Sequence, residues 1–141
     1  MNAKLLKYAI AFWLVDAVFA FLNFMILMNL IYEPILGELP AHRIGMMTRI
    51  ALIFILSFFL LRMVKEYETV DLLQVGVFWL ILELLLEWGG SLLMGRPVEE
   101  ILVGWNLLDG HIWILVLLAY LIGPYIVGKH IIEVYMNPNK N

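Results

Sequence analysis

The third apolar stretch of the chain carries two carboxylates that could take part in proton or cation chemistry, Glu83 and Glu87. Side chains four residues apart lie on the same face of a helix. The same narrow stripe contains Gly76, Trp79, Gly90 and Met94. A charged side chain at the centre of a bilayer costs at least about 2.5–3.5 kcal/mol. Two acids on one stripe therefore require partners, water or protons.

Arg49, in the second apolar stretch, is the cation expected at a depth similar to that of Glu87. Because a guanidinium matches a carboxylate in shape, one interpretation is a structural ion pair that joins the second and third stretches. A single arginine cannot neutralise two acids, however. Either one glutamate is protonated at neutral pH, or a cation, a second base or water completes the site. The second interpretation is therefore a proton- or cation-binding pair, Glu83 and Glu87, with Arg49 as its counter-charge.

Five further polar residues are expected to support this pair. They are Asp16 and Asn23 in the first apolar stretch and Asn106, Asp109 and His111 before the last one. The last three are predicted to form an outer vestibule. For Asp16 we also expect a hydrogen bond to a neighbouring helix, through Asn23 or a hydroxyl group.

A metal site is a further alternative for the same region. Its ligands would be Glu83, Glu87, Asp109 and His111, with His42 as an optional further ligand, which is an oxygen-rich set with imidazole. The spacing matches neither the Glu-x-x-His motif of di-iron bundles nor HExxH. No nucleophile arrangement and no phosphate-binding glycine loop is present in the sequence, so an enzyme is not favoured and no cofactor is predicted.

The composition is that of a membrane protein. Of the 141 residues, 64% are hydrophobic and only 15% are charged, whereas a soluble domain keeps about a quarter of its residues charged. The expected partner is therefore a lipid bilayer. A net charge of −3, without a large cluster of Lys and Arg, argues against nucleic acid as a partner. Because the chain has no cysteine, disulfides and thiolate-ligated metals are excluded.

Four stretches are long enough to cross the roughly 30 Å hydrocarbon core, which takes about 20 apolar residues. We expect an all-α, polytopic protein, a four-helix antiparallel transmembrane bundle with a short interfacial helix before the last span. The spans are predicted at residues 8–31, 44–64, 70–94 and 111–128, with an irregular loop over 33–43 and the short helix over 97–109. Residues 1–136 would form a single domain, and residues 137–141 a disordered tail.

Three smaller features of the helices can also be predicted. Gly123-Pro124 should kink the last span. Gly89-Gly90 and the small residues Ala119 and Gly123 should permit close approach between helices.

The distribution of Lys and Arg predicts the orientation. One side of the predicted topology carries six of these residues: Lys4, Lys7, Arg62, Lys65, Lys129 and Lys140. The other side carries three: Arg43, Arg49 and Arg96. Because basic residues favour the cytoplasmic side, both termini are predicted to lie inside.

The preferred functional hypothesis is a small proton- or cation-coupled transporter, or a channel-like protein, for an ion or small polar solute. The alternative is an accessory or assembly subunit of a larger membrane complex, in which the same charges serve helix packing. In either case a homo-oligomer or a larger complex is the expected setting. A metal-dependent membrane enzyme is the third hypothesis.

Overall fold

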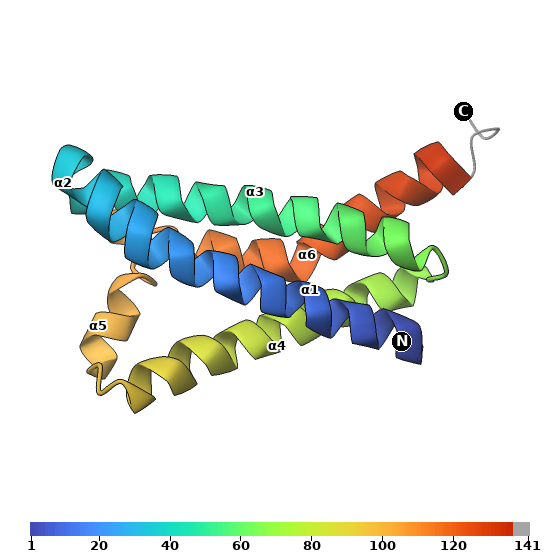
Figure 1. Cartoon of the computed structure of the whole chain (residues 1–141), viewed down its shortest axis with the longest axis horizontal. Coiled ribbons are helices and arrows are strands. Elements are labelled where there is room, and N and C mark those ends of the chain that lie inside the picture. Colours follow the sequence, from blue (N-terminus) through green and yellow to red (C-terminus); the bar gives the residue numbers. More distant parts are fainter. Residues whose placement is uncertain (137–141) are drawn as a thin grey trace.

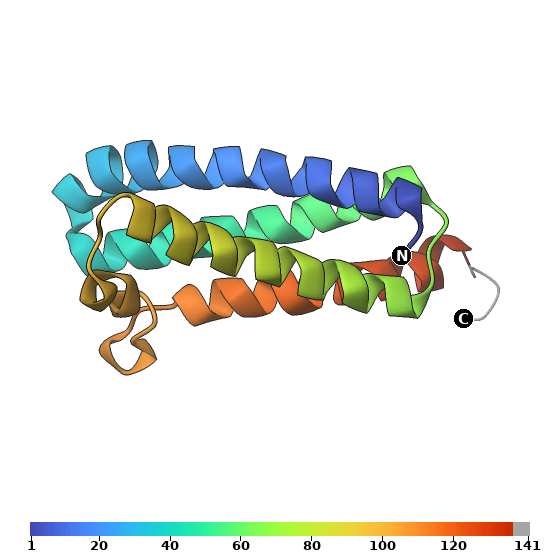
Figure 2. The ribbon, with the colours of Figure 1, turned by 90° about the horizontal axis from the view of Figure 1, so that it is seen from below.

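The structure, a computed structural model, describes residues 1–136 and contains four helices long and apolar enough to cross a membrane. They form the predicted all-helical bundle, in which successive long helices run in opposite directions (Figures 1 and 2). The first span comprises α1 (Ala3–Leu22), the π-helical segment η1 (Asn23–Tyr32) and α2 (Glu33–Leu36). The others are α3 (Glu38–Val64), α4 (Thr69–Leu93) and α6 (Trp113–Ile131), which continues into a second π-helical segment, η3 (Ile132–Met136).

The turn between the first two spans is much tighter than predicted. Residues 33–43, expected to form an irregular loop, are helical except at Gly37, and α3 begins at Glu38 rather than at residue 44. Pro34 and Pro40 lie in the first turns of α2 and α3, where the missing proline N–H costs no helical hydrogen bond. Gly37 alone turns the chain, with a φ of 90° that side chains disfavour.

The connection between α4 and α6 also differs from the prediction. Instead of one helix over 97–109, it contains α5 (Val98–Val103) and a separate 3₁₀ turn, η2 (Leu107–Asp109). Gly104 ends α5, and the side chain of Asn106 accepts a hydrogen bond from the backbone N–H of Asp109. Asparagine side chains compete with helical backbone bonds in this way, so the chain starts a new turn there.

Close packing between α4 and α6 depends on a glycine that the sequence did not single out for that role. A Cβ atom at Gly76 would overlap the carbonyl oxygen of Leu121. Gly89 and Gly90, predicted to allow close approach, meet nothing within 4 Å. At Gly123 a Cβ would make an ordinary contact of 3.4 Å with Ile53. Pro124 lies inside α6, whose second half departs from the line of its first half in Figure 1.

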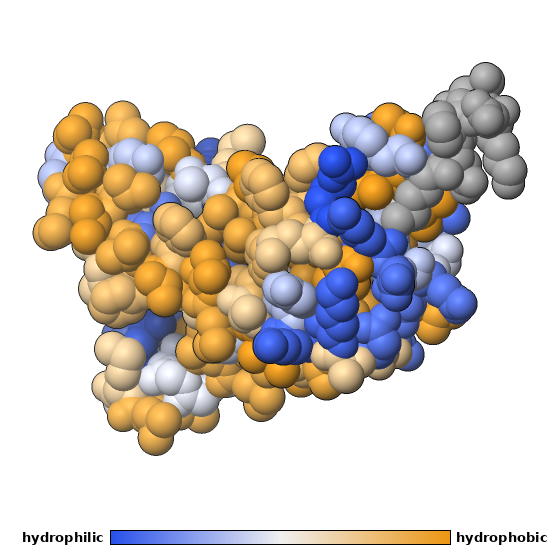
Figure 3. Space-filling model, turned by 45° about the vertical axis from the view of Figure 1, so that its right-hand side comes forward, coloured by the Kyte–Doolittle hydropathy of each residue, from blue (hydrophilic) through white to orange (hydrophobic). Residues whose placement is uncertain are grey.

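The two ends of the bundle differ in charge. The beginning of α1 and the end of η3 lie at the same end of the bundle as the connection between α3 and α4, where Figure 3 shows hydrophilic residues gathered beside an otherwise apolar surface. The basic residues Lys4, Lys7, Arg62, Lys65 and Lys129 belong to the helix ends and the connection at this end. Which side of the membrane this end faces stays a prediction. The predicted disordered tail and Lys140 fall outside the described residues.

Candidate functional site

Arg49 is the centre of a buried polar cluster that takes one residue from each span. Its side chain extends from α3 into the bundle, and the residue is only 6% exposed. The Nη2 atom lies 3.1 Å from Glu83 Oε1 on α4 and 3.6 Å from Asp16 Oδ2 on α1. Nη2 also donates a hydrogen bond to the hydroxyl of Tyr120 on α6. We call Asp16, Arg49, Glu83 and Tyr120 the charge cluster.

Aromatic side chains from α6 complete the surroundings of the guanidinium. The hydroxyl of Tyr120 accepts from Arg49 and donates to Asp16 Oδ2, so it joins the arginine to one of its two acids. The rings of Trp113 and Tyr120 lie 5.1 Å and 5.7 Å from the Arg49 Cζ atom. Cation–π attraction at these distances favours the charged arginine in a site shielded from water.

The charge cluster is incompletely neutralised and incompletely hydrogen-bonded. With both acids ionised, one guanidinium faces two carboxylates, which leaves a net charge of −1. Asp16 Oδ1, Glu83 Oε2 and Arg49 Nε are all buried without a hydrogen-bond partner. Buried polar atoms in proteins are normally paired. The cluster can therefore take up one proton on a free carboxylate oxygen and become neutral.

The helical stripe predicted that Glu87 shares Arg49 with Glu83, but in the structure Glu87 has other partners. Its Oε1 accepts a hydrogen bond from Trp105 Nε1 at 2.9 Å, and its Oε2 accepts one from Trp113 Nε1 at 3.0 Å. Figures 1 and 2 show that α4 crosses the bundle obliquely, so successive turns of its inner face meet different neighbours. Glu83 faces Arg49, whereas Glu87 faces the α5–α6 region. Trp113 contacts both sites, with its N–H at Glu87 and its ring beside Arg49.

Asn23 and Asp16 form separate contacts, although both are buried on the first span. The Nδ2 atom of Asn23 donates to the Gly45 carbonyl at 3.2 Å, while its Oδ1 has no partner. The predicted hydroxyl partner of Asp16 exists, and it is Tyr120.

The residues predicted to form a vestibule do not converge on the acids in α4. Asn106 donates to Asp109 Oδ2 at 2.6 Å, and this pair is exposed. His111 lies against His42, with ring centroids 4.9 Å apart. His42 Nε2 accepts from the backbone N–H of Ile112 at 3.0 Å, so this histidine joins the beginning of α3 to the beginning of α6.

The metal alternative is not supported by the arrangement of possible ligands. Among residues 1–136, no three His, Asp or Glu side chains are grouped so that they could hold a metal ion. The four predicted ligands lie at separate places. Glu83 belongs to the charge cluster, and Glu87 bonds to Trp105 and Trp113. Asp109 bonds to Asn106, and His111 lies against His42.

Sequence reasoning missed three aromatic residues that hold the acids: Trp105, Trp113 and Tyr120. Their polar atoms bond to Glu87 or Asp16. Tyr120 could have been identified from the sequence, because it places a phenol within an apolar span and a buried hydroxyl needs a hydrogen-bond partner. Trp105 and Trp113 offered no comparable signal, because tryptophan is common at membrane interfaces.

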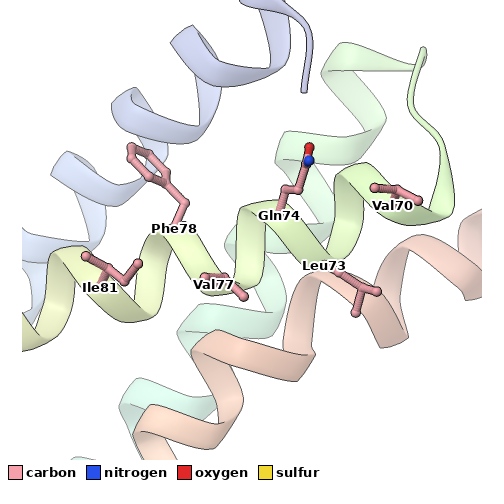
Figure 4. Close-up of a pocket in the computed structure, with 6 residues that line it drawn as sticks. All are labelled: Val70, Leu73, Gln74, Val77, Phe78 and Ile81. Carbon is pink, nitrogen blue, oxygen red and sulfur yellow. The ribbon is translucent and has the colours of Figure 1, made fainter.

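The outer surface of the bundle, over the described residues 1–136, includes two apolar depressions. The first, of about 400 Å³, runs along α4 and is lined by Val70, Leu73, Gln74, Val77, Phe78 and Ile81 (Figure 4). The second, of about 430 Å³, lies between the first span and α3, and Asn23 and Arg49 are among its lining residues. We call the second one the lateral groove.

Comparisons with known proteins do not assign this chain to a group. No protein-family model, no curated protein and no solved structure matches it. The chain is an integral membrane bundle by composition and structure, and its function has to be inferred from the charge cluster.

Proposed function

We propose that this protein is a small proton-coupled membrane transporter in which the charge cluster is the proton-binding site. The observation that carries the proposal is that Asp16 and Glu83, from different helices, share the single guanidinium of Arg49 in the bundle interior. Because an unneutralised charge is costly at membrane depth, a site with net charge −1 favours the uptake of one proton. The sequence-based hypothesis had placed this role on Glu83 and Glu87. The geometry favours Glu83 and Asp16.

Protonation of either acid gives the transporter two distinct states. When Asp16 is protonated, Arg49 pairs with Glu83 alone, and when Glu83 is protonated, Arg49 pairs with Asp16. These acids belong to α4 and α1, so the change redistributes attraction between helices that must move in alternating access. A ligand or proton shifts such an equilibrium by its differential affinity for the two states. Tyr120, bonded to both Arg49 and Asp16, keeps the two acids in one network.

A second candidate function rests on the same cluster. Because its four residues come from four spans, it also fixes the bundle as a structural staple, as in an accessory subunit of a larger complex. The two functions differ in one respect. A staple keeps one protonation state, whereas a transporter must gain and lose a proton near neutral pH.

The test is a proton titration of the full chain in liposomes, with infrared detection of protonated carboxyl groups. We expect a carboxyl band that titrates near neutral pH and that is altered by Glu83→Gln and by Asp16→Asn. Glu99→Gln on α5, an exposed acid, is the matched control and should leave the band unchanged. In the same liposomes, an imposed pH gradient should drive proton flux in the parent protein and not in Glu83→Gln.

Two results would contradict the proposal. If no carboxyl titrates between about pH 5 and pH 9, the cluster is a fixed staple. If Glu83→Gln retains a proton flux equal to that of the parent protein, Glu83 does not take part in proton transfer.

A further inference from the structure

The lateral groove brings an apolar surface and two buried polar residues together beside the charge cluster. Its walls come from the first span and α3 and include Phe19, Ile26 and Leu52, while Asn23 and Arg49 form part of its lining. Its volume, about 430 Å³, lies within the roughly 300–1,000 Å³ of small-molecule sites. In a bilayer such a groove admits molecules from the hydrocarbon layer rather than from water.

The two polar residues offer one donor and one acceptor. Arg49 Nε carries a hydrogen but donates to nothing, because the contacts with the acids and with Tyr120 are all made by Nη2. Asn23 Oδ1 accepts nothing. Both residues are only 6% exposed. The Asn23 amide bonds to the carbonyl of Gly45, which lies four residues before Arg49 on α3. Asn23 therefore contacts α3 about one helical turn away from Arg49.

Charge then limits the head group of a ligand. An anionic head would be a third negative charge on an arginine already shared by Asp16 and Glu83. A cationic head would meet the guanidinium of Arg49 first. A neutral hydroxyl avoids both repulsions, and it offers both an acceptor, which the unpaired Arg49 Nε lacks, and a donor, which the unpaired Asn23 Oδ1 lacks.

We propose that the lateral groove binds a long-chain amphiphile with a neutral hydroxyl head, either a long-chain alcohol or a protonated long-chain carboxylic acid. The hydroxyl bonds to Arg49 and Asn23, and the hydrocarbon chain lies along the apolar walls. The further claim that this amphiphile is the transported molecule rests on the proposed transport function. It replaces the ion or small polar solute expected from the sequence.

The backbone of the first span supports a ligand site at this place. The helix changes from α to π between Leu22 and Asn23, and the groove is lined on both sides of that change. π-Helical turns are uncommon and occur frequently at functional sites. The groove therefore coincides with a departure from regular α-helix in the first span.

The experiment uses the full chain in lipid nanodiscs and a 1-hexadecanol probe with a photoreactive diazirine in mid-chain. Mass spectrometry locates the labelled residues. We expect labelling concentrated on groove residues, and about tenfold weaker in Leu52→Trp, which fills the groove. Ile55→Trp, on a half-exposed position of the same helix outside the groove lining, is the matched control and should label as the parent does.

Competition defines the head group. Unlabelled 1-hexadecanol should compete about thirtyfold better than hexadecane, as two net hydrogen bonds of roughly 1 kcal/mol each predict, and Asn23→Leu, which removes one of them, should reduce that preference to about fivefold. Hexadecyl sulfonate and hexadecyltrimethylammonium should compete no better than hexadecane. If palmitic acid competes only at low pH, the protonated acid is a ligand. If palmitic acid does not compete at any pH, the long-chain alcohol remains as the proposed ligand.

Even labelling of all lipid-facing side chains, or equal competition by hexadecane and hexadecanol, would overturn the inference. Stronger competition by either charged amphiphile would do so as well. Groove labelling without carboxyl titration would leave the binding site standing and remove the transport function. Carboxyl titration without groove labelling would remove only the cargo.

Discussion

Replacing Arg49 by methionine is the most direct perturbation of the charge cluster. Methionine keeps an unbranched side chain that fills irregular space, but it removes the charge and all donors. Asp16 and Glu83 would then face each other without a counter-ion in a site where both are less than 4% exposed. Loss of one partner of a buried ion pair costs roughly 3–5 kcal/mol, so we expect a decrease of that size in the free energy of unfolding.

Second-site changes show which acid depends on the arginine. Adding Glu83→Gln to Arg49→Met removes one of the two orphaned charges, and the double variant should recover about 1–3 kcal/mol relative to additivity. Glu87→Gln is the matched control on the same helix. Because Glu87 bonds to tryptophan N–H groups and not to Arg49, its effect should add to that of Arg49→Met.

The assay is reversible unfolding in mixed micelles with increasing dodecyl sulfate, followed by far-ultraviolet circular dichroism. Equal recovery with Glu83→Gln and Glu87→Gln would refute the separation of the two glutamates. Strict additivity in both double variants would refute the ion pair itself.

Three further predictions concern packing, the α5 region and topology. Gly76→Ala should destabilise the bundle in the same unfolding assay by about 1–3 kcal/mol, because its Cβ meets the backbone of α6, whereas Gly89→Ala should be tolerated; equal effects would contradict the packing. Trp105→Phe removes a hydrogen bond to a carboxylate and should raise amide hydrogen exchange in α5 roughly tenfold, and unchanged exchange would mean that this bond does not hold the segment. Single cysteines replacing Glu38 and Glu66 should react with an impermeant maleimide from outside and inside respectively, and the reverse pattern would invert the predicted orientation.

The architecture could be predicted because the bilayer imposes it. A spanning helix must be long and apolar, so the four spans are visible as four hydrophobic stretches, and short connections require antiparallel neighbours. Helix ends were less predictable, because proline occurs both in loops and in the first turns of helices. Pro34 and Pro40 were interpreted as loop residues, yet each lies in a first helical turn, where its missing N–H has no consequence.

The site could be predicted only in part. Sequence spacing shows which residues share a face of one helix, but it does not show the angles at which helices cross. The depth of Arg49 predicted an arginine level with Glu87 that serves as counter-charge to the glutamate pair, whereas in the structure Arg49 contacts Glu83. The oblique path of α4 carries Glu87 to different neighbours. Asp16 was expected only as a supporting polar residue, and its contact with Arg49 was not predicted, because nothing in a single sequence shows how α1 is rotated about its axis.

The distribution of the charge cluster over the chain has a consequence for how the protein is made. Asp16 and Arg49 belong to the first helical hairpin, and Glu83 and Tyr120 to the second. The two buried charges of the first hairpin can therefore compensate each other when that hairpin enters the membrane. The second hairpin brings an acid to an arginine that is already engaged, and a glutamic acid enters hydrocarbon at lower cost than a glutamate. Biosynthetic insertion of the second hairpin and the proposed working cycle thus depend on the same protonation step.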